Sequence, residues 1–126
     1  PRVRRQRQMC IRDRFVDDVT KVEIEKIGPM LECDKIFPHR ANIEFVQVLS
    51  MEEVNMRVWE RGSGETWACG TGACAVAVAS AANRKTDRSV TVHLRGGDLH
   101  VKWEEKTDKV LMRGPAEFVF DGTIEI

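Results

Sequence analysis

The fold of this chain is decided by the stretch Trp59-Glu60-Arg61-Gly62-Ser63-Gly64-Glu65-Thr66-Trp67-Ala68-Cys69-Gly70-Thr71-Gly72-Ala73-Cys74-Ala75. Its first part is a glycine-rich loop, and its end begins an apolar segment that continues to Ala82. Residues 73–82 are small and apolar on every side, which predicts a helix that is buried all round. The basic residues in Asn83-Arg84-Lys85 suit the C-terminal end of such a helix.

Segments with strand periodicity lie on both sides of this helix. They are residues 42–49, 54–59, 90–94, 99–103, 110–113 and 116–120. Two of them surround Gly96-Gly97, which is the strongest hairpin signal in the chain. Farther upstream, residues 15–19 predict a strand end and a turn, and the helical pattern over 22–31 is broken by Gly28-Pro29 into short turns. The sequence predicts an α+β fold in which about six strands, mainly antiparallel, wrap one buried central helix.

The composition limits the classes of partner. Lysine plus arginine equals aspartate plus glutamate, 20 each, so neither nucleic acid nor a membrane surface is expected to bind. Residues 1–14 nevertheless hold six arginines against one acid. No apolar segment approaches the ~20 residues that span a bilayer, and no signal peptide is expected. Four scattered cysteines do not suit a disulfide scaffold, which favours a cytoplasmic location.

Cys69 is the candidate for chemistry because it stands where the loop becomes the helix. Unpaired N–H groups and a partial positive charge at a helix start favour a thiolate, so we expect a lowered pKa for this thiol. The N–H groups of Gly70 and Thr71 are placed to hold a carboxylate. The alternative is an inert small hydrophobe, which we expect for Cys74 inside the helix.

Other sites that use glycine-rich loops or cysteines do not fit this stretch. A P-loop requires a lysine before its helix, and none occurs between Gly62 and Gly72. The dinucleotide fingerprint requires a glycine where Trp67 stands. Cys69 and Cys74 are spaced so that they point about 140° apart on a helix, so no metal site is expected.

Residues 60–75 resemble the C-terminal signature of the diaminopimelate epimerase family, and Phe37-Pro38-His39-Arg40-Ala41-Asn42-Ile43-Glu44-Phe45 is similar to a second family segment. The resemblance covers residues 15–126. It implies a curved sheet around a central helix, as one of two similar domains with the active site between them. It also implies an isomerase without cofactor or metal, which interconverts LL- and meso-diaminopimelate for lysine and peptidoglycan precursors. One cysteine from each domain faces the α-carbon, so that one thiolate removes the proton and the other thiol delivers one.

The resemblance assigns roles to six residues. Cys69 matches the C-terminal catalytic thiol, and Gly70 and Thr71 match backbone donors to the reacting carboxylate. Residues that match those recognising the distal amino-acid end of the substrate are Asn42, Glu60 and Arg61. Without the resemblance, these three would be interpreted as a turn asparagine and a surface ion pair.

Two departures from the family affect this interpretation. The Cys-Gly-Asn-Gly motif that carries the first catalytic cysteine does not occur here, and Cys10 has no glycine beside it to replace it. Residues 6–14, just before Phe15, stand where the family has Gly-Asn-Pro-His and resemble translated sequencing-adapter sequence. We therefore expect 1–14 to be non-native or disordered and 15–126 to be the C-terminal domain. We also expect it to be inactive without its N-terminal partner domain and prone to self-association, for example as a homodimer.

Two other functions remain open from the sequence. One is a different isomerase of the same architecture, such as a proline racemase-like or phenazine-biosynthesis-type enzyme. The other is a non-catalytic binding module with a basic arm, in which Cys69 is unreactive.

Overall fold

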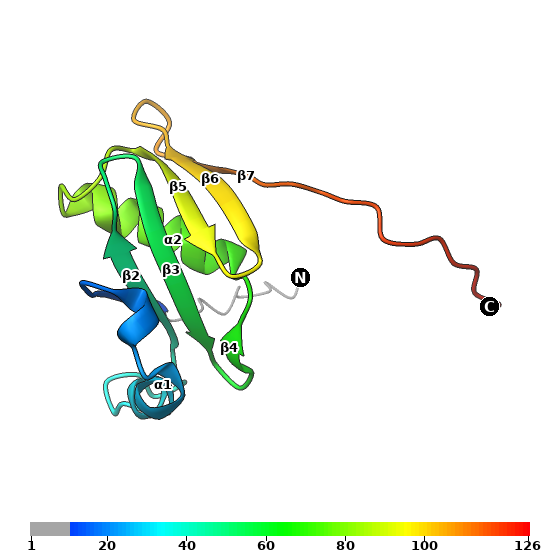
Figure 1. Cartoon of the computed structure of the whole chain (residues 1–126), viewed down its shortest axis with the longest axis horizontal. Helices are drawn as coiled ribbons and strands as arrows, with labels where there is room; N and C mark the ends of the chain where they lie inside the picture. Colours follow the sequence, from blue (N-terminus) through cyan, green and yellow to red (C-terminus); the bar gives the residue numbers. More distant parts are fainter. Residues whose placement is uncertain (1–10) are drawn as a thin grey trace, which may run out of the picture.

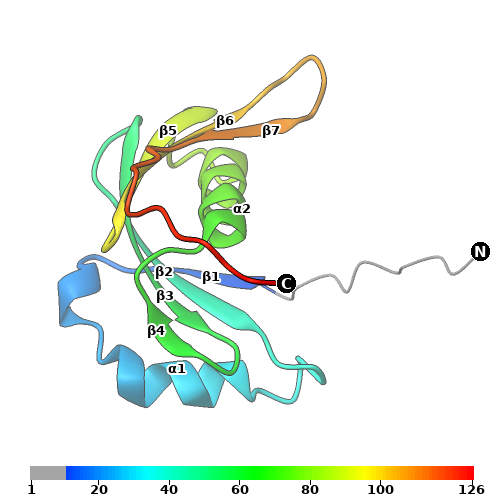
Figure 2. The same cartoon turned by 90° about the vertical axis from the view of Figure 1, so that its right-hand side faces the viewer.

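The computed structural model describes residues 11–126, in which a seven-stranded sheet curls around one helix (Figures 1 and 2). The strands are β1 (Ile11–Phe15), β2 (Asn42–Val48), β3 (Glu53–Glu60), β4 (Gly64–Thr66), β5 (Ser89–Leu94), β6 (Gly97–Trp103) and β7 (Val110–Arg113). The helices are α1 (Ile24–Glu32) and α2 (Gly70–Ala82), with a 3-10 turn at Val19–Lys21. The strand order is β1-β2-β3-β5-β6-β7, with β4 paired to β3. Only β1–β2 and β3–β5 are parallel among these pairs, so the predicted α+β class with a mainly antiparallel sheet is confirmed.

The two faces of the sheet pack against two different helices. Successive side chains of a strand point to opposite faces, and in β2 both faces are covered. Val46 belongs to the core cluster that packs with α2, whereas Ile43 and Phe45 belong to the cluster on the α1 side. This two-sided burial explains why β2 carries apolar residues on both faces, with Glu44 among them.

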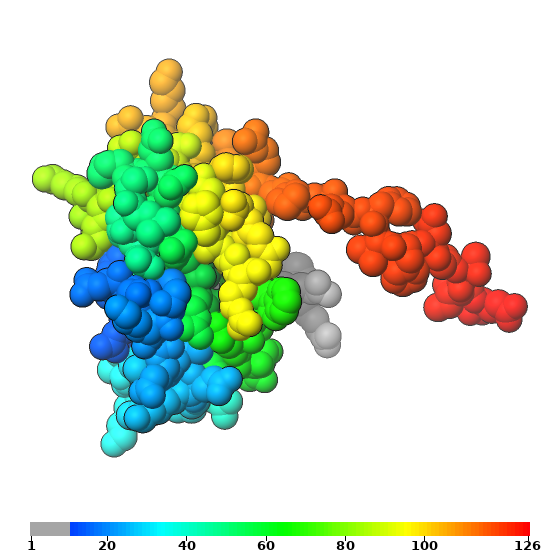
Figure 3. Space-filling model, in the orientation of Figure 1, coloured from blue at the N-terminus to red at the C-terminus, as the bar shows by residue number. Residues whose placement is uncertain are grey.

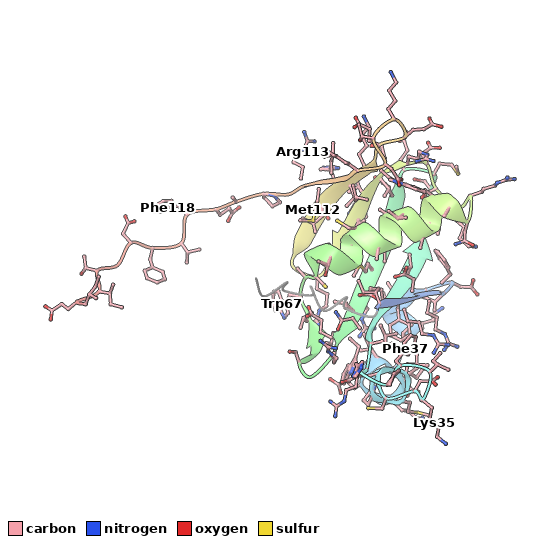
Figure 4. All side chains as sticks on the ribbon, turned by 180° about the vertical axis from the view of Figure 1, so that it is seen from behind. Lys35, Phe37, Trp67, Met112, Arg113 and Phe118 are labelled. Carbon is pink, nitrogen blue, oxygen red and sulfur yellow. The ribbon has the colours of Figure 1, made fainter. Side chains whose placement is uncertain are left out.

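Helix α2 is covered on one side only, which corrects the prediction that it is buried all round. Its buried residues are Gly72, Ala73, Val76, Ala77 and Ser80. On the other side Cys74, Ala75 and Val78 are partly exposed, and Figure 4 shows α2 from this side, in front of the sheet. Small apolar residues around a whole helix therefore leave an apolar face without cover in the described part of the chain.

Helix α1 runs without interruption through Gly28-Pro29, so the prediction of short broken turns is wrong. Ile24, Gly28 and Glu32 are buried one turn apart on the same face. A β-carbon added to Gly28 would lie 2.5 Å from Cγ of Trp59, so the glycine lets the helix pack directly on the indole ring. Packing of this kind outweighs weak helix propensity.

The C-terminal part of the chain confirms one prediction and corrects another. The hairpin forms as expected, with Leu94 paired to Gly97 across the turn. Residues 116–120 form no strand in the structure. Residues 114–126 run away from the body as an extended segment (Figure 3), and Phe118 is 85% exposed. A strand requires a neighbouring edge, and this segment lies beside none here.

Strand β1 contains residues 11–14, which the sequence places in a non-native or disordered segment. In the structure they pair in parallel with β2, from Ile11 opposite Asn42 to Phe15 opposite Val46. The remainder of that segment, with Cys10, lies outside the described residues. Whether residues 1–14 are native to the protein stays a prediction.

Candidate functional site

A pocket of about 650 Å³ lies where the loop after β4 enters α2. It is lined by Glu60, Ala68, Cys69, Gly70, Thr71, Cys74 and Met112. Four parts of the chain supply these residues, namely the end of β3, the loop between β4 and α2, the first turns of α2, and β7. In Figure 4, Met112 lies beside the beginning of α2, and its Cε would be 3.2 Å from a β-carbon added to Gly70. The structure thus brings together four of the six residues that the sequence assigned to a site.

Cys69 is the residue that precedes the first turn of α2, as the sequence predicts. Its backbone is extended, with φ −144° and ψ 104°, and its carbonyl accepts the Ala73 N–H at 2.9 Å. Helix geometry leaves the N–H groups of Gly70 and Thr71 without a partner inside the helix. The thiol is buried, and its Sγ lies 3.6 Å from the Thr71 hydroxyl. The start of α2 therefore offers one sulfur and two backbone donors to the same pocket.

The protonation of Cys69 contradicts the sequence prediction of a lowered pKa. Burial raises the pKa of this thiol above its ordinary value. Hydrogen bonds from the Thr71 hydroxyl and the Gly72 N–H lower the pKa without overcoming burial, and Glu60 and Glu44 raise it further. Removal from water disfavours the charged form of an acid. Cys69 is thus a protonated thiol at neutral pH in this structure.

Glu60 lines the pocket, and its Oε1 accepts a hydrogen bond from the Thr66 hydroxyl at 2.7 Å. This bond joins the end of β3 to β4, whose strands already pair there. The Glu60 carboxyl is consequently fixed at the edge of the pocket. It is the one acidic side chain among the pocket residues.

Asn42 and Arg61 do not line the pocket. The Asn42 side-chain oxygen accepts the backbone N–H of Arg61 at 2.8 Å. The Arg61 guanidinium, which is exposed, donates to the carbonyl of His39 at 2.9 Å. Both residues thus fasten the turn after β3 to the loop before β2. The surface ion pair expected as the ordinary interpretation of Glu60 and Arg61 does not form between them in the structure.

Two carboxyls near the site were missed by the sequence interpretation. Glu32 accepts hydrogen bonds from Trp59 Nε1 at 2.8 Å and from the Gly62 N–H at 3.2 Å, and so holds both sides of Arg61. Glu44 is fully buried beneath the start of α2. No sequence signal distinguishes Glu32 from the other acids of α1. Glu44 could have been noticed as an acid inside an apolar strand.

The described residues contain no group of three or more histidine, cysteine or acidic side chains that could hold a metal ion. Within the same range no helix is long and apolar enough to cross a membrane.

Comparison with known proteins identifies the family. The sequence model described as diaminopimelate epimerase matches residues 14–119. A diaminopimelate epimerase of Agathobacter rectalis is 58% identical over 112 residues, which are 89% of this chain and 39% of that protein. One from Phocaeicola vulgatus is 54% identical over 89% of this chain and 40% of its own length. This chain therefore spans about two fifths of the curated relatives it matches.

A solved structure supports the fold. The Bacillus anthracis phenazine biosynthesis protein of the PhzF family superposes with a TM-score of 0.55 at 17% identity, over 79% of this chain and 33% of that one. At this identity the likeness concerns the fold alone. The matches in sequence are far closer and extend over nearly the whole described chain. The chain belongs to the diaminopimelate epimerase family.

Proposed function

We propose that this chain supplies one half of the active site of a cofactor-independent diaminopimelate epimerase, with Cys69 as one of its two catalytic thiols. The observation that carries the proposal is the start of α2, where a buried sulfur and the N–H groups of Gly70 and Thr71 face one pocket. The relatives named above are diaminopimelate epimerases. We propose lysine and peptidoglycan precursor synthesis in the cytoplasm as the setting.

The proposed reaction inverts the α-carbon by two proton transfers. One thiolate takes the α-proton and becomes a thiol, and a thiol on the opposite face gives its proton to the resulting carbanion and becomes a thiolate. Negative charge that develops on the substrate carboxylate is stabilised by the N–H groups of Gly70 and Thr71. Because burial keeps Cys69 protonated, this thiol is ready to donate its proton, whereas the reverse direction requires its ionisation.

The distal end of diaminopimelate carries a second ammonium and a second carboxylate. We propose that Asn42, Glu60 and Arg61 recognise this end. Glu60 lines the pocket and can accept from the ammonium. Arg61 follows Glu60 in the chain and is exposed, so its guanidinium can turn toward the substrate and pair with the carboxylate. Asn42 holds the Arg61 backbone in place.

The second thiol belongs to a part of the enzyme that this chain does not contain, so we expect no turnover by the chain alone. We propose that residues 15–126 form the C-terminal domain and that an N-terminal domain covers the pocket. The uncovered face of α2 then leads the isolated chain to self-associate, for example as a homodimer. Sedimentation of the purified chain tests this point, and a strictly monomeric species at high concentration contradicts it.

The activity is tested by α-deuterium incorporation into LL-diaminopimelate in D2O under reducing conditions. The sample is this chain mixed with the N-terminal half of the Agathobacter rectalis relative, after association has been verified. Exchange that requires both halves and is lost in Cys69→Ser supports the proposal. The matched control is Cys33→Ser, which removes an exposed thiol and should exchange normally. No exchange by a folded, associated pair overturns the proposed activity.

Residues 1–14 are proposed to be foreign to this domain. Asp13 is partly buried opposite Glu44, and its Oδ1 has no hydrogen-bond partner among the described residues. Burial raises the pKa of Asp13 to about 6. Native strands rarely place two unpartnered acids side by side, because each costs free energy to bury. The family match begins at residue 14, which lies within one residue of the proposed boundary and supports it.

A further inference from the structure

Glu44 is a buried acid that the proposed reaction does not use. It lies in β2 on the side of the sheet that faces α2, and its exposed fraction is 0%. Among the described residues neither of its carboxyl oxygens has a hydrogen-bond partner, and none of the ion pairs includes it. A charged carboxylate in such a place is very unfavourable, so the group resists ionisation.

Gly72 brings this carboxyl close to the thiol of Cys69. A β-carbon added to Gly72 would lie 2.6 Å from Glu44 Oε1 and 3.2 Å from Cys69 Sγ. Both atoms therefore border the space that a side chain at position 72 would fill. The glycine leaves this space open to the carboxyl, the thiol and the methyl group of Met56, which would lie 3.0 Å from the added carbon.

The groups around Glu44 make its ionisation harder still. Asp13 faces it from β1 as its partner in the strand register, and Glu60 approaches from β3. From α2 it is faced by Cys69, with Cys74 in the next turn. Burial raises the pKa of Glu44 to about 8, and the negative charges of Asp13 and Glu60 add to this effect.

We propose that Glu44 is a positioning residue that controls the ionisation of Cys69, because the thiol can become a thiolate readily only while the Glu44 carboxyl keeps its proton. Two negative charges this close and out of water repel strongly, so the first group to lose its proton suppresses the other. The inference rests on the proposed role of Cys69 as the reacting thiol. It extends that role by naming the group that limits when the thiol can act as a base.

The competition has a distinctive signature in the pH profile of the thiol. While Glu44 is neutral, the fraction of Cys69 thiolate rises with pH as in a chain without the carboxyl. Once Glu44 ionises, the rise is held back. Glu44→Gln keeps the size of the side chain and removes this effect.

The test is the rate of iodoacetamide alkylation of Cys69 in the full chain from pH 6 to 10, quantified by peptide mass spectrometry. We expect equal rates in wild type and Glu44→Gln below pH 7 and a rate on the order of tenfold higher in Glu44→Gln above pH 9. The control is Glu53→Gln, which removes an exposed carboxylate at the far end of β3 and should match wild type. Circular dichroism at each pH verifies the fold.

Two results would overturn the proposal, namely a ratio near one at every pH and a ratio that is constant but different from one. The second result indicates a change of structure rather than of charge. If Glu44→Gln does not fold, the carboxyl carbon of Glu44 is followed by NMR in wild type and Cys69→Ser. Titration well above the range of an ordinary glutamate, altered by Cys69→Ser, supports the coupling, and an ordinary titration refutes it.

These readouts do not require the proposed reaction to occur. Coupled titration without deuterium exchange in the reconstituted enzyme would retain the role of Glu44 and reject the activity. Deuterium exchange by an enzyme whose Cys69 titrates independently of Glu44 would retain the proposed activity and reject the role of Glu44.

Discussion

Replacing Glu44 with glutamine should remove a pH-dependent loss of stability from this chain. The pKa of the folded carboxyl is raised by burial to about 8, against an ordinary value of 4.5 that we take for the unfolded chain. The folded state therefore holds this proton more tightly. The stability that the carboxyl contributes is fully present below pH 4.5 and is lost as the pH rises through 8. Glutamine has no proton to lose in this range.

The magnitude follows from the difference between the two pKa values. One unit is worth about 1.4 kcal/mol, which sets an upper limit of roughly 5 kcal/mol. Local relaxation and penetrating water lower the cost of a buried carboxylate, and we expect about half of this limit. The free energy of unfolding of wild type, relative to Glu44→Gln, should thus fall by about 2–3 kcal/mol between pH 5 and pH 8.

The assay is urea unfolding of both chains, followed by tryptophan fluorescence at four pH values from 5 to 8. Asp13 also has a raised pKa, about 6, and its charge raises the pKa of Glu44, so the difference between the two chains includes the coupling of these two carboxyls. The exposed variant Glu53→Gln serves as the control and should show no such trend. A difference between wild type and Glu44→Gln that is the same at pH 5 and pH 8 would refute the reasoning.

Three further substitutions test the packing around the site. Gly72→Ala should lower the free energy of unfolding by about 1–3 kcal/mol despite the better helix propensity of alanine, since the new methyl group meets Glu44 Oε1 at 2.6 Å; unchanged urea stability would contradict this contact. Gly28→Ala should cost about 2 kcal/mol and shift the fluorescence of Trp59, whose ring lies 2.5 Å from the added carbon; an unaltered spectrum and midpoint would argue against it. Asp13→Val should raise stability by about 1–2 kcal/mol at pH 7, and because the pKa of Asp13 is about 6 the gain should vanish below pH 4; a gain that persists at pH 4 would exclude the buried charge as its cause.

Features set by local sequence could be predicted. The turn at Gly96-Gly97 and the beginning of α2 at Cys69 follow from residues adjacent in the chain, and both form as expected. The continuity of α1 could not be predicted, because it depends on Trp59 packing on Gly28 from a distant strand. The lack of strand pairing at residues 116–120 could not be predicted either, because an alternating pattern does not show whether a sheet edge is present for the segment to pair with.

The candidate site also combines local features that the sequence predicts with features of the surroundings that it does not. The identity of Cys69 as the residue at the helix start is a local property, and the pocket formed around it. Its pKa is a property of the surroundings, which include the carboxyls of Glu60 and Glu44 from two other strands. Glu32 was missed for the same reason, because its partners lie about thirty residues away in the chain.

The start of α2 favours negative charge while burial disfavours it, and this conflict constrains how Cys69 can react. The N–H groups at the start of α2 favour an anion in the pocket, yet burial and two carboxyls keep the thiol itself protonated. A domain that closes over the pocket removes more water and strengthens this preference. On the proposed function, we expect a bound substrate to promote thiolate formation at neutral pH, because its ammonium group brings positive charge into the pocket. On this argument the thiol of the isolated chain should alkylate slowly at neutral pH, and an N-terminal half added without diaminopimelate should make it slower rather than faster.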